Sequence, residues 1–460
     1  MSAIVTFLET CFAVLQNWYY GLAGLAGLVR IAIGALFSGK GSFKEKIAGA
    51  LLAPAGTRKI MSFLRAFWPT VVTERKVVQA YENNGTVAVT RRVDVLEVLQ
   101  RNADFAVVYG PRMREITQNE PGVPGNNFFL GMQPGWAYTR DTSAMRLAAR
   151  ATDVAEIILP RANQVAEDAV AAADGIIDLP QDVGLRTSSD MVGHYFGTPG
   201  PSRAEMIEWT TVMFWYLFAD LGASEKLAAR AHSAMAQSRA YLDRTIAERK
   251  ASGSKADDVI GRCLAMQSAG VAGVLEDIDI RNNIVGLLIG AVPTLSKASC
   301  LALDELLRRP EELRGAQKAA QDGNDELLAQ YLWEALRFNP HQPVLYRRAT
   351  RDAVIARGTL RETTIPEGRM VFAVTLSAAF DPLDVPLANE FRTNRPADTY
   401  MTWGYGMHNC FGEVINRAVI PAILKPVLKL RNLRYADGWE GIDTRGTPFP
   451  AHMKLAYDRE

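Results

Sequence analysis

The stretch Trp403-Gly-Tyr-Gly-Met-His-Asn-Cys-Phe-Gly412 is the one around which the predicted fold is organised, and Cys410 is its chemical centre. Its glycines permit positive φ angles and a close approach to a flat partner, where a Cβ would clash. These are Gly404, Gly406 and Gly412. A helical pattern follows at residues 413–430, so Cys410 is predicted to lie close to a helix N-terminus, where free N–H groups and the helix dipole stabilise a thiolate. A lone cysteine beside such a turn is more often buried and inert, so other motifs in the sequence are needed to decide whether Cys410 has a chemical role.

A second motif lies upstream, in residues 331–340. Glu334 and Arg337 stand at i and i+3, a spacing that allows them to pair on one face of a helix. Taken by itself, such a pair is usually a solvated salt bridge. Its position upstream of the cysteine stretch makes the pair informative, because the two motifs can be interpreted together.

The cysteine stretch resembles the heme-binding signature of the cytochrome P450 family, aromatic-x-x-Gly-x-(His/Arg)-x-Cys-x-Gly. The matching residues are Trp403, Gly406, His408, Cys410 and Gly412, with Trp403 where the family more often has Phe. Glu334 and Arg337 match the family's Glu-x-x-Arg helix, in the same order along the chain. The resemblance covers residues 73–460. It implies a mainly α fold with a small β-rich subregion and a long central helix over a noncovalent heme b (iron protoporphyrin IX).

The resemblance also implies which residues hold the heme. Cys410 is the expected ligand of the iron, and Arg347 and His408 are expected to bind heme propionates, with Arg348 as the competitor of Arg347. Arg140 is a further propionate candidate, as is Arg146. The complete predicted heme-binding set is Cys410, His408, Arg347, Trp403, Gly404, Gly406, Gly412 and Arg140.

Residues 277–309 are predicted to form one long, mostly apolar helix, which resembles the family's central helix. That helix usually carries Gly-Gly-x-acid-Thr or Ala-Gly-x-acid-Thr at the oxygen site, and the gap-free register places Thr294 on the threonine and Pro293 on the acid. The carboxylate of the proton relay is then missing. A proline inside a helix removes one N–H donor at a cost of roughly 3 kcal/mol, which predicts a kink and a groove. A shift by one residue would put Pro293 on the threonine instead, and the sequence leaves both registers open.

Residues 1–72 are predicted to form an apolar leader, and residues 73–460 a single heme-thiolate catalytic domain. Residues 10–29 carry no charge and are long enough to span a bilayer, although Asn17 and several glycines weaken the pattern. The first basic residue is Arg30, which argues against a cleavable signal peptide. Three alternatives stay open: a spanning anchor, a helix lying on the membrane, and a leader packed on protein, of which the last two together are favoured. Basic residues follow, as expected near anionic lipid, so we expect a cytoplasmic protein with peripheral membrane contact as an open alternative.

Composition limits the classes of partner. The 51 Lys and Arg residues nearly balance the 50 Asp and Glu residues, and no basic stripe indicates a nucleic acid. The four cysteines lack the paired spacing of a disulfide framework or a zinc site. We therefore expect a hydrophobic small molecule as the ligand.

Two further local patterns carry predictions. Residues 77–81 and 87–93 flank Asn83-Asn84-Gly85 and predict a β-hairpin. Residues 105–135, rich in glycine and proline, are predicted to be an irregular loop that resembles the family's substrate-contacting segment.

Three functions follow from the resemblance. The first is a heme-thiolate monooxygenase that hydroxylates a fatty acid, terpenoid or steroid-like molecule with dioxygen. Its electrons would come from a separate redox partner, a ferredoxin or a reductase, because the sequence shows no flavin or iron–sulfur domain. The second is a peroxide-dependent peroxygenase, or an isomerase or dehydratase of fatty-acid hydroperoxides, since such enzymes often lack the acid–threonine pair. The third is a non-enzymatic heme-thiolate binding protein.

Overall fold

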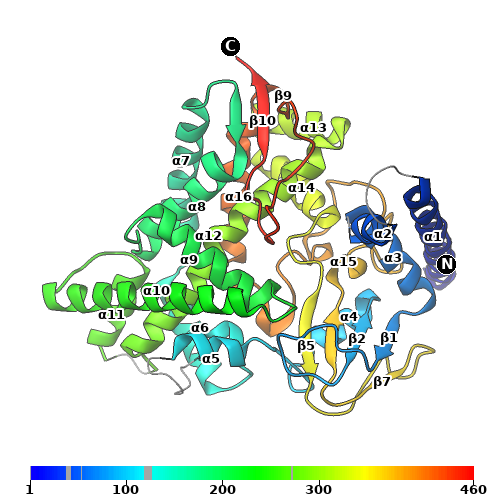
Figure 1. Ribbon diagram of the computed structural model, residues 1–460, viewed down its shortest axis with the longest axis horizontal. Helices are drawn as coiled ribbons and strands as arrows, with labels where there is room; N and C mark the ends of the chain where they lie inside the picture. Colours follow the sequence, from blue (N-terminus) through cyan, green and yellow to red (C-terminus); the bar gives the residue numbers. More distant parts are fainter. Residues whose placement is uncertain (1, 38–42, 53, 119–126, 271–272, 460) are drawn as a thin grey trace. The chain divides into compact units, whose positions relative to one another are not determined.

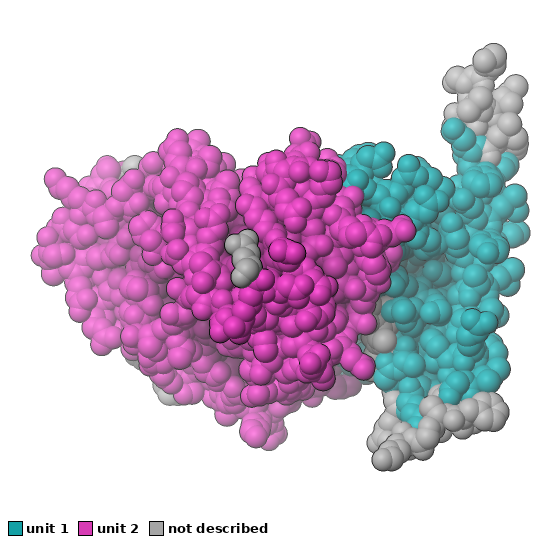
Figure 2. Space-filling model, turned by 90° about the horizontal axis from the view of Figure 1, so that it is seen from above, with its two compact units in different colours: residues 1–78, 82–106, 333–409 teal, residues 79–81, 107–332, 410–460 magenta. Residues whose placement is uncertain are grey.

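The computed structural model describes residues 2–37, 43–52, 54–118, 127–270 and 273–459. The chain divides into two compact units, which are coloured separately in Figure 2. Unit 1 comprises residues 1–78, 82–106 and 333–409, and unit 2 comprises residues 79–81, 107–332 and 410–460. The predicted leader falls within unit 1, whereas the predicted catalytic domain contributes to both units.

Unit 1 combines helices with a mixed sheet (Figure 1). Its helices are α1 (Ser2–Phe37), α2 (Phe43–Leu52), α3 (Pro54–Phe67), α4 (Arg92–Gln100), the end of α14 (Asp325–Phe338) and α15 (Thr375–Ala378). Its larger sheet has the order β1 (Thr70–Thr73), β2 (Thr86–Val89), β8 (Met370–Ala373), β5 (Leu345–Ala349) and β3 (Phe105–Ala106), and β6 (Ala353–Ile355) pairs with β7 (Thr363–Ile365). Strands β2 and β8 run parallel, and the other neighbours in the larger sheet are antiparallel. Val87 and Val371 of these two strands pack with Val95 and Leu99 of α4, which covers the sheet.

The predicted hairpin is wrong in its first strand, because β2 pairs with β1 and residues 77–81 form no strand. The Asn83 side chain satisfies the local backbone instead. Its amide donates to the carbonyl of Val78 at 2.8 Å, and its oxygen accepts from the N–H of Gly85 at 3.2 Å. Asparagine side chains commonly replace ladder hydrogen bonds in this way, so the Asn-Asn-Gly signal marks a longer turn.

Unit 2 is mainly helical. Its helices include α5 (Gly110–Thr117), α6 (Trp136–Ala148), α7 (Leu159–Ala171), α8 (Leu185–Met191), α9 (Arg203–Phe214), α10 (Glu225–Ser252), α11 (Val259–Ser268), α12 (Asp277–Leu307), α13 (Pro310–Gln321) and α16 (Glu413–Leu428). A small antiparallel sheet has the order β4 (Ile176–Asp178), β10 (Lys454–Asp458) and β9 (Arg431–Tyr435). The prediction of an irregular loop at residues 105–135 is wrong for α5, whose first turn holds Pro111, a residue preorganised for that position. Residues 119–126 of that predicted loop lie outside the described residues.

Helix α12 is the core helix of unit 2, and it runs unbroken through Pro293. Within the described residues it is the one helix long and apolar enough to cross a membrane by length and composition. Its most apolar 18-residue window has a mean hydropathy of 1.7 and is 72% buried, so the hydrophobicity of α12 is that of a core helix. The predicted long helix is therefore confirmed.

The predicted pair on α14 forms and is completely buried. The guanidinium of Arg337 binds the Glu334 carboxylate at 2.7 and 2.9 Å, and Arg395 binds the same carboxylate at 3.0 Å. Arg337 also donates to the carbonyls of Ala379 and Ala388 at 3.0 and 2.7 Å. The expectation of a solvated pair does not apply here, because these charges link distant segments of unit 1.

Replacing Arg337 with Met should lower the free energy of unfolding by about 3–5 kcal/mol, because it leaves the carboxylate of Glu334 buried with one partner fewer. Urea unfolding followed by circular dichroism measures this loss. The matched control is Arg392→Ala, whose side chain is 37% exposed and pairs with the exposed Glu390, and it should change stability by no more than about 0.5 kcal/mol. Equal losses in the two variants would contradict a structural role for the buried pair.

Candidate functional site

Cys410 lies just before α16, so the predicted position near a helix N-terminus is observed. Its sulfur accepts hydrogen bonds from the backbone N–H of Gly412 and from the Asn416 side chain, whose Nδ2 lies 3.7 Å from Sγ. Burial nevertheless raises the pKa of the Cys410 thiol to about 11. Two donors aimed at a sulfur suit a thiolate, whereas burial alone disfavours it, so a bound cation would complete the charge balance.

The glycines before the cysteine have a clear conformational role. Gly404 and Gly406 adopt φ angles of +80° and +75°, as predicted. A Cβ on Gly406 would lie 2.8 Å from the carbonyl oxygen of Leu99 in α4, so this turn also requires the close approach that glycine permits. The expectation is wrong for Gly412, which has a φ of −84° as the N-cap of α16. A Cβ there would lie 3.9 Å from Cys410 Sγ, an ordinary contact.

Arg347 and His408 lie close together in unit 1. Arg347 is 3% exposed on β5, and it is the buried member of the two adjacent arginines. Arg348 is 37% exposed at its side chain and lies 3.5 Å from the exposed carboxylate of Glu82. Burial and, second, the nearby charge of Arg347 lower the pKa of His408 to about 4. The pair therefore offers one guanidinium and one neutral imidazole to an anion at neutral pH.

Trp403, the aromatic residue of the signature, is 7% exposed and packs edge-on against Trp333 with ring centroids 5.2 Å apart. It thereby joins the cysteine stretch to α14. Its predicted role beside a heme stays a prediction.

The two arginines of α6 have different environments in unit 2. Arg140 is held by the carboxylates of Asp141 and Asp279, at 2.7 and 3.0 Å. Arg146 lies 4.7 Å from the ring centroid of Phe411, the residue after Cys410. The prediction for Arg140 stays untested, although its guanidinium is already engaged by α12, and Arg146 is the one placed against the cysteine loop.

Pro293 and Thr294 lie on α12, where two hydroxyl groups accompany the proline. The Thr294 hydroxyl donates to the carbonyl of Gly290 within the helix, and Ser188 of α8 donates to the carbonyl of Val292 at 2.9 Å. Thr294 remains partly exposed, whereas Pro293 is buried. Of the two, the threonine is therefore the residue whose side chain can meet a ligand.

Sequence reasoning missed Asn416 and Ser188. Asn416 is a polar residue in the first turns of the apolar helix that follows the cysteine. A polar residue in that position is only a weak signal for a side chain that donates a hydrogen bond to the cysteine sulfur. Ser188 reaches α12 from a helix about a hundred residues earlier in the chain, and no local pattern could reveal that contact.

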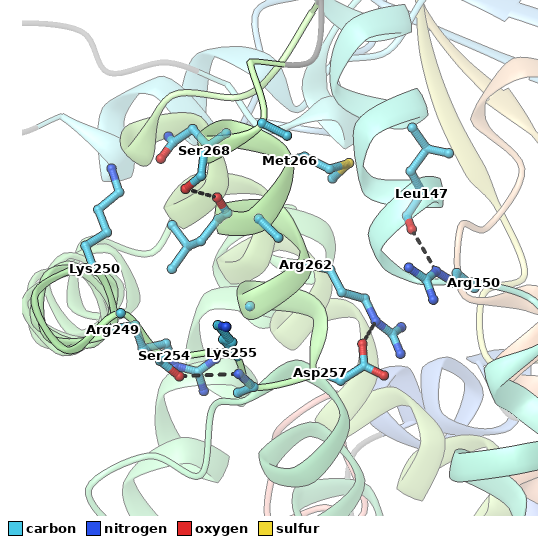
Figure 3. Close-up of a pocket in the computed structure, with 17 residues that line it drawn as sticks. Leu147, Arg150, Arg249, Lys250, Ser254, Lys255, Asp257, Arg262, Met266 and Ser268 are labelled. Carbon is cyan, nitrogen blue, oxygen red and sulfur yellow. Dashed lines mark hydrogen bonds and ion pairs between the residues drawn. The ribbon is translucent and has the colours of Figure 1, made fainter.

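A groove of about 1220 Å³ in unit 2 lies apart from these residues (Figure 3). Basic side chains line it, but carboxylates already bind several of them. Arg249 binds Asp258 at 2.6 Å, and Arg262 binds Asp257 at 2.6 Å. None of the predicted site residues lines this groove, so it is a charged surface feature separate from the candidate site.

This geometry agrees with a family comparison. The family model described as cytochrome P450 matches residues 81–438. The chain therefore belongs to the cytochrome P450 family. Members of the family bind heme through a cysteine thiolate, so the cofactor of this protein is heme b.

Known relatives cover different shares of the chain. Pulcherriminic acid synthase of Bacillus subtilis is 25% identical over 325 residues, which are 66% of this chain and 75% of that protein. Cytochrome P450 monooxygenase PikC of Streptomyces venezuelae is 26% identical over 285 residues, 60% of this chain and 63% of PikC. The bifunctional dioxygenase (DOX)-epoxy alcohol synthase (EAS) of Fusarium oxysporum is 27% identical over 229 residues, 44% of this chain but only 18% of the relative.

A solved structure confirms the fold class. Cytochrome P450 CYP109Q5 from Chondromyces apiculatus superposes with a TM-score of 0.71 and 19% identity, over 90% of this chain and 97% of that one. The predicted mainly α fold with a small β-rich subregion is thus confirmed.

The assignment of Cys410 to the heme iron can be tested by Cys410→Ser, because a serine hydroxyl cannot supply a thiolate. We expect the carbonyl complex of the reduced protein to lose its thiolate-type spectrum. The control is Cys263→Ala, which removes a different thiol, buried on α11, and should leave the spectrum unchanged. A thiolate-type spectrum in the Cys410→Ser protein would refute the assignment.

Proposed function

We propose that this protein is a monooxygenase that oxidises a hydrophobic small molecule with dioxygen and electrons from a separate redox partner, a ferredoxin or a reductase. The observation that carries the proposal is the partly exposed Cys410 sulfur at the start of α16, with Gly412 and Asn416 donating to it. The similarity to PikC, a monooxygenase, supports the same reaction class.

The residues present fit a heme. Cys410 would hold the iron, and Arg347 and His408 would bind propionates, since their environments suit an anion. The glycine turn at Gly404 and Gly406 leaves the backbone without side chains that could obstruct a flat ring. When bound, a heme with a thiolate ligand supplies the oxidising chemistry.

Proton delivery depends on the residues of α12. Pro293 occupies the position of the acid in the gap-free register, so the carboxylate that usually relays protons is missing there. Thr294 provides a partly exposed hydroxyl, which donates to Gly290 and can accept from a water. Ordered water and Thr294 are therefore the proton carriers that this helix offers.

A second candidate function is peroxide-driven oxidation or hydroperoxide isomerisation. Two observations favour it: the proline at position 293, and the similarity to the dioxygenase-epoxy alcohol synthase over part of the chain. A hydroperoxide already carries two electrons and a proton, so it requires neither an acid relay nor a redox partner.

Turnover of a fatty-acid and terpenoid panel distinguishes the two candidates. We expect product with ferredoxin or reductase partners and NADPH, and little product with hydrogen peroxide alone. Product with peroxide and none with the partners would replace the first proposal by the second.

Pro293→Asp should raise the fraction of electrons that end in product, because it restores a carboxylate beside Thr294. Pro293→Ala is the matched control, since it removes the same proline without adding an acid. Measured coupling between NADPH consumption and product should rise in the first variant alone. An equal rise in both would show that the proline's effect on the helix, rather than the missing acid, limits coupling.

We further propose that one face of α1 contacts a membrane surface. The opposite face packs on α3 so closely that a Cβ on Gly24 would lie 2.7 Å from the carbonyl of Lys59 (Figure 1). Apolar side chains cover the outer face and are 40–67% exposed. These are Phe12, Leu15, Trp18, Tyr19, Leu22, Leu25, Val29 and Ile33.

An anionic bilayer surface is the occupant that fits this face best. A single helix face of eight exposed apolar side chains, two of them Trp and Tyr, has the composition of an interfacial helix. The sequence that follows adds Lys40, Lys44, Lys46, Arg58 and Lys59, whereas Arg65 is 1% exposed and donates to Asn17 and Ser377 instead. Positive charge beside an apolar face adds attraction to anionic lipid.

Replacing Leu15 and Leu22 together with Glu should weaken binding to vesicles of phosphatidylcholine and phosphatidylserine by at least about tenfold, because two leucine side chains lose their burial in lipid. Cosedimentation measures this binding. The control is Leu360→Glu, a fully exposed leucine elsewhere in unit 1. Unchanged vesicle binding, or loss of a dimer instead of vesicle binding, would contradict the lipid proposal.

A further inference from the structure

A second groove of unit 2, with a volume of about 530 Å³, is lined by residues of α7, α8 and α9. Helix α8 packs against both α7 and α9, which brings the three helices together (Figure 1). Each helix contributes one arginine to the groove, Arg161 from α7, Arg186 from α8 and Arg203 from α9. None of the residues of the candidate heme site lines it, so a ligand here would be separate from the heme and from the oxidised substrate.

The three arginines differ in their partners. Arg161 is neutralised, because its Nε and Nη2 bind the two carboxylate oxygens of Asp190 at 2.7 and 2.9 Å. Arg186 and Arg203 pair with no carboxylate in the part of the chain that the structure describes. Arg186 is only partly exposed, so its charge has lost some of its water without gaining a partner. The groove therefore presents two unpaired guanidinium groups on adjacent helices.

The remaining charges of the groove leave it positive. Its second carboxylate, that of Asp168, accepts a hydrogen bond from Gln164 at 2.8 Å. Three arginines thus face two aspartates, and the exposed imidazole of His194 adds a group that can also carry a positive charge. An excess of positive charge in a concave site attracts an anion.

A buried hydroxyl group lies in the wall of the same groove. Ser189 of α8 is 9% exposed, and its Oγ has no hydrogen-bond partner among the described residues. The serine before it has one, because Ser188 donates to the carbonyl of Val292 at 2.9 Å. A buried hydroxyl group is costly when it is left unpaired, so an oxygen of a bound ligand would compensate the Ser189 hydroxyl.

We propose that this groove binds the phosphate group of a small phosphate monoester. One guanidinium fork is enough to bind both oxygens of a carboxylate, whereas two forks and a hydroxyl group suit the three terminal oxygens of a phosphate. The volume of the groove lies within the range of small-molecule sites, and Val165 and Pro199 offer apolar contacts to the body of the ester.

A different prediction follows if the arginines only keep the surface soluble. They would then attract every anion weakly and in proportion to its charge, and salt would screen this attraction. A built phosphate site instead distinguishes a phosphate monoester from another dianion of similar size. Selectivity at constant ionic strength is therefore the property to measure.

The test is isothermal titration calorimetry on the heme-loaded protein at constant ionic strength. The ligands are inorganic phosphate, glycerol 3-phosphate and adenosine monophosphate, with glycerol and adenosine as uncharged counterparts and succinate as a dianion without phosphorus. The variants are Arg186→Gln, Arg203→Gln and Ser189→Ala. The control is Arg431→Gln, which removes an exposed arginine on β9 of the same unit.

We expect at least one phosphate monoester to bind about tenfold or more tightly than its alcohol and than succinate, as for charge-assisted hydrogen bonds. Arg186→Gln and Arg203→Gln should each weaken this binding at least about tenfold, Ser189→Ala should weaken it less, and Arg431→Gln should leave it unchanged. An unchanged carbonyl spectrum of each variant shows that the fold is intact, and Arg203 is exposed, so its variant tests the site even if Arg186→Gln is unstable.

Three results would overturn the proposal: no binding of any phosphate ligand, equal binding of succinate, or phosphate binding that the arginine variants leave unchanged. Each is obtained without turnover, and no residue of the groove belongs to the candidate heme site. The failure of this proposal would therefore leave the proposed oxidation standing.

Discussion

The completely buried carboxylate of Glu334 is the constraint on which unit 1 depends. A charge in such a place is tolerated only when partners replace the lost water. Arg337 and Arg395 supply them, and the backbone N–H of Arg392 adds a third donor at 2.9 Å. Since Arg337 also donates to the carbonyls of distant residues, one group of charges fixes α14 and the chain that leads to the cysteine stretch. The loss of one donor would leave the buried carboxylate with incomplete compensation for the water that it has lost.

A comparable problem arises inside α12 of unit 2, where a proline interrupts the backbone hydrogen bonds. Pro293 cannot donate a hydrogen bond, and buried backbone groups are costly when they are left unpaired. The carbonyl with which Pro293 cannot pair is that of Ile289, four residues earlier. Two hydroxyl groups bind other carbonyls of this helix, since Thr294 donates to that of Gly290 and Ser188 donates to that of Val292. The helix continues through the proline, and the bond to Gly290 orients the threonine hydroxyl along its own helix.

Much of the fold and of the candidate site follows from local patterns. The glycine turn before Cys410 and the long apolar helix depend on residues adjacent in sequence, and both were predicted. The hairpin prediction was wrong because the whole sheet, and not the local pattern, determines which strands pair. The side chain of Asn83 also satisfies a backbone carbonyl in the segment that the pattern assigned to a strand. The environment of Arg140 could not be predicted from the sequence for a similar reason, since its partner Asp279 lies far along the chain. Side-chain partners between distant elements leave no periodic signal.

The rotation of α12 about its own axis is the clearest case of this limit. A helix that is apolar on all sides carries almost no periodic signal, so its sequence cannot say which face meets a ligand. Packing decides it, because α12 is buried from Asp279 to Leu306 except at Gly290, Ala291, Thr294, Lys297 and Leu301, which lie on one side of the helix. Thr294 and Lys297 both lie on that side, so they are the polar groups of one surface rather than two isolated polar residues in an apolar run.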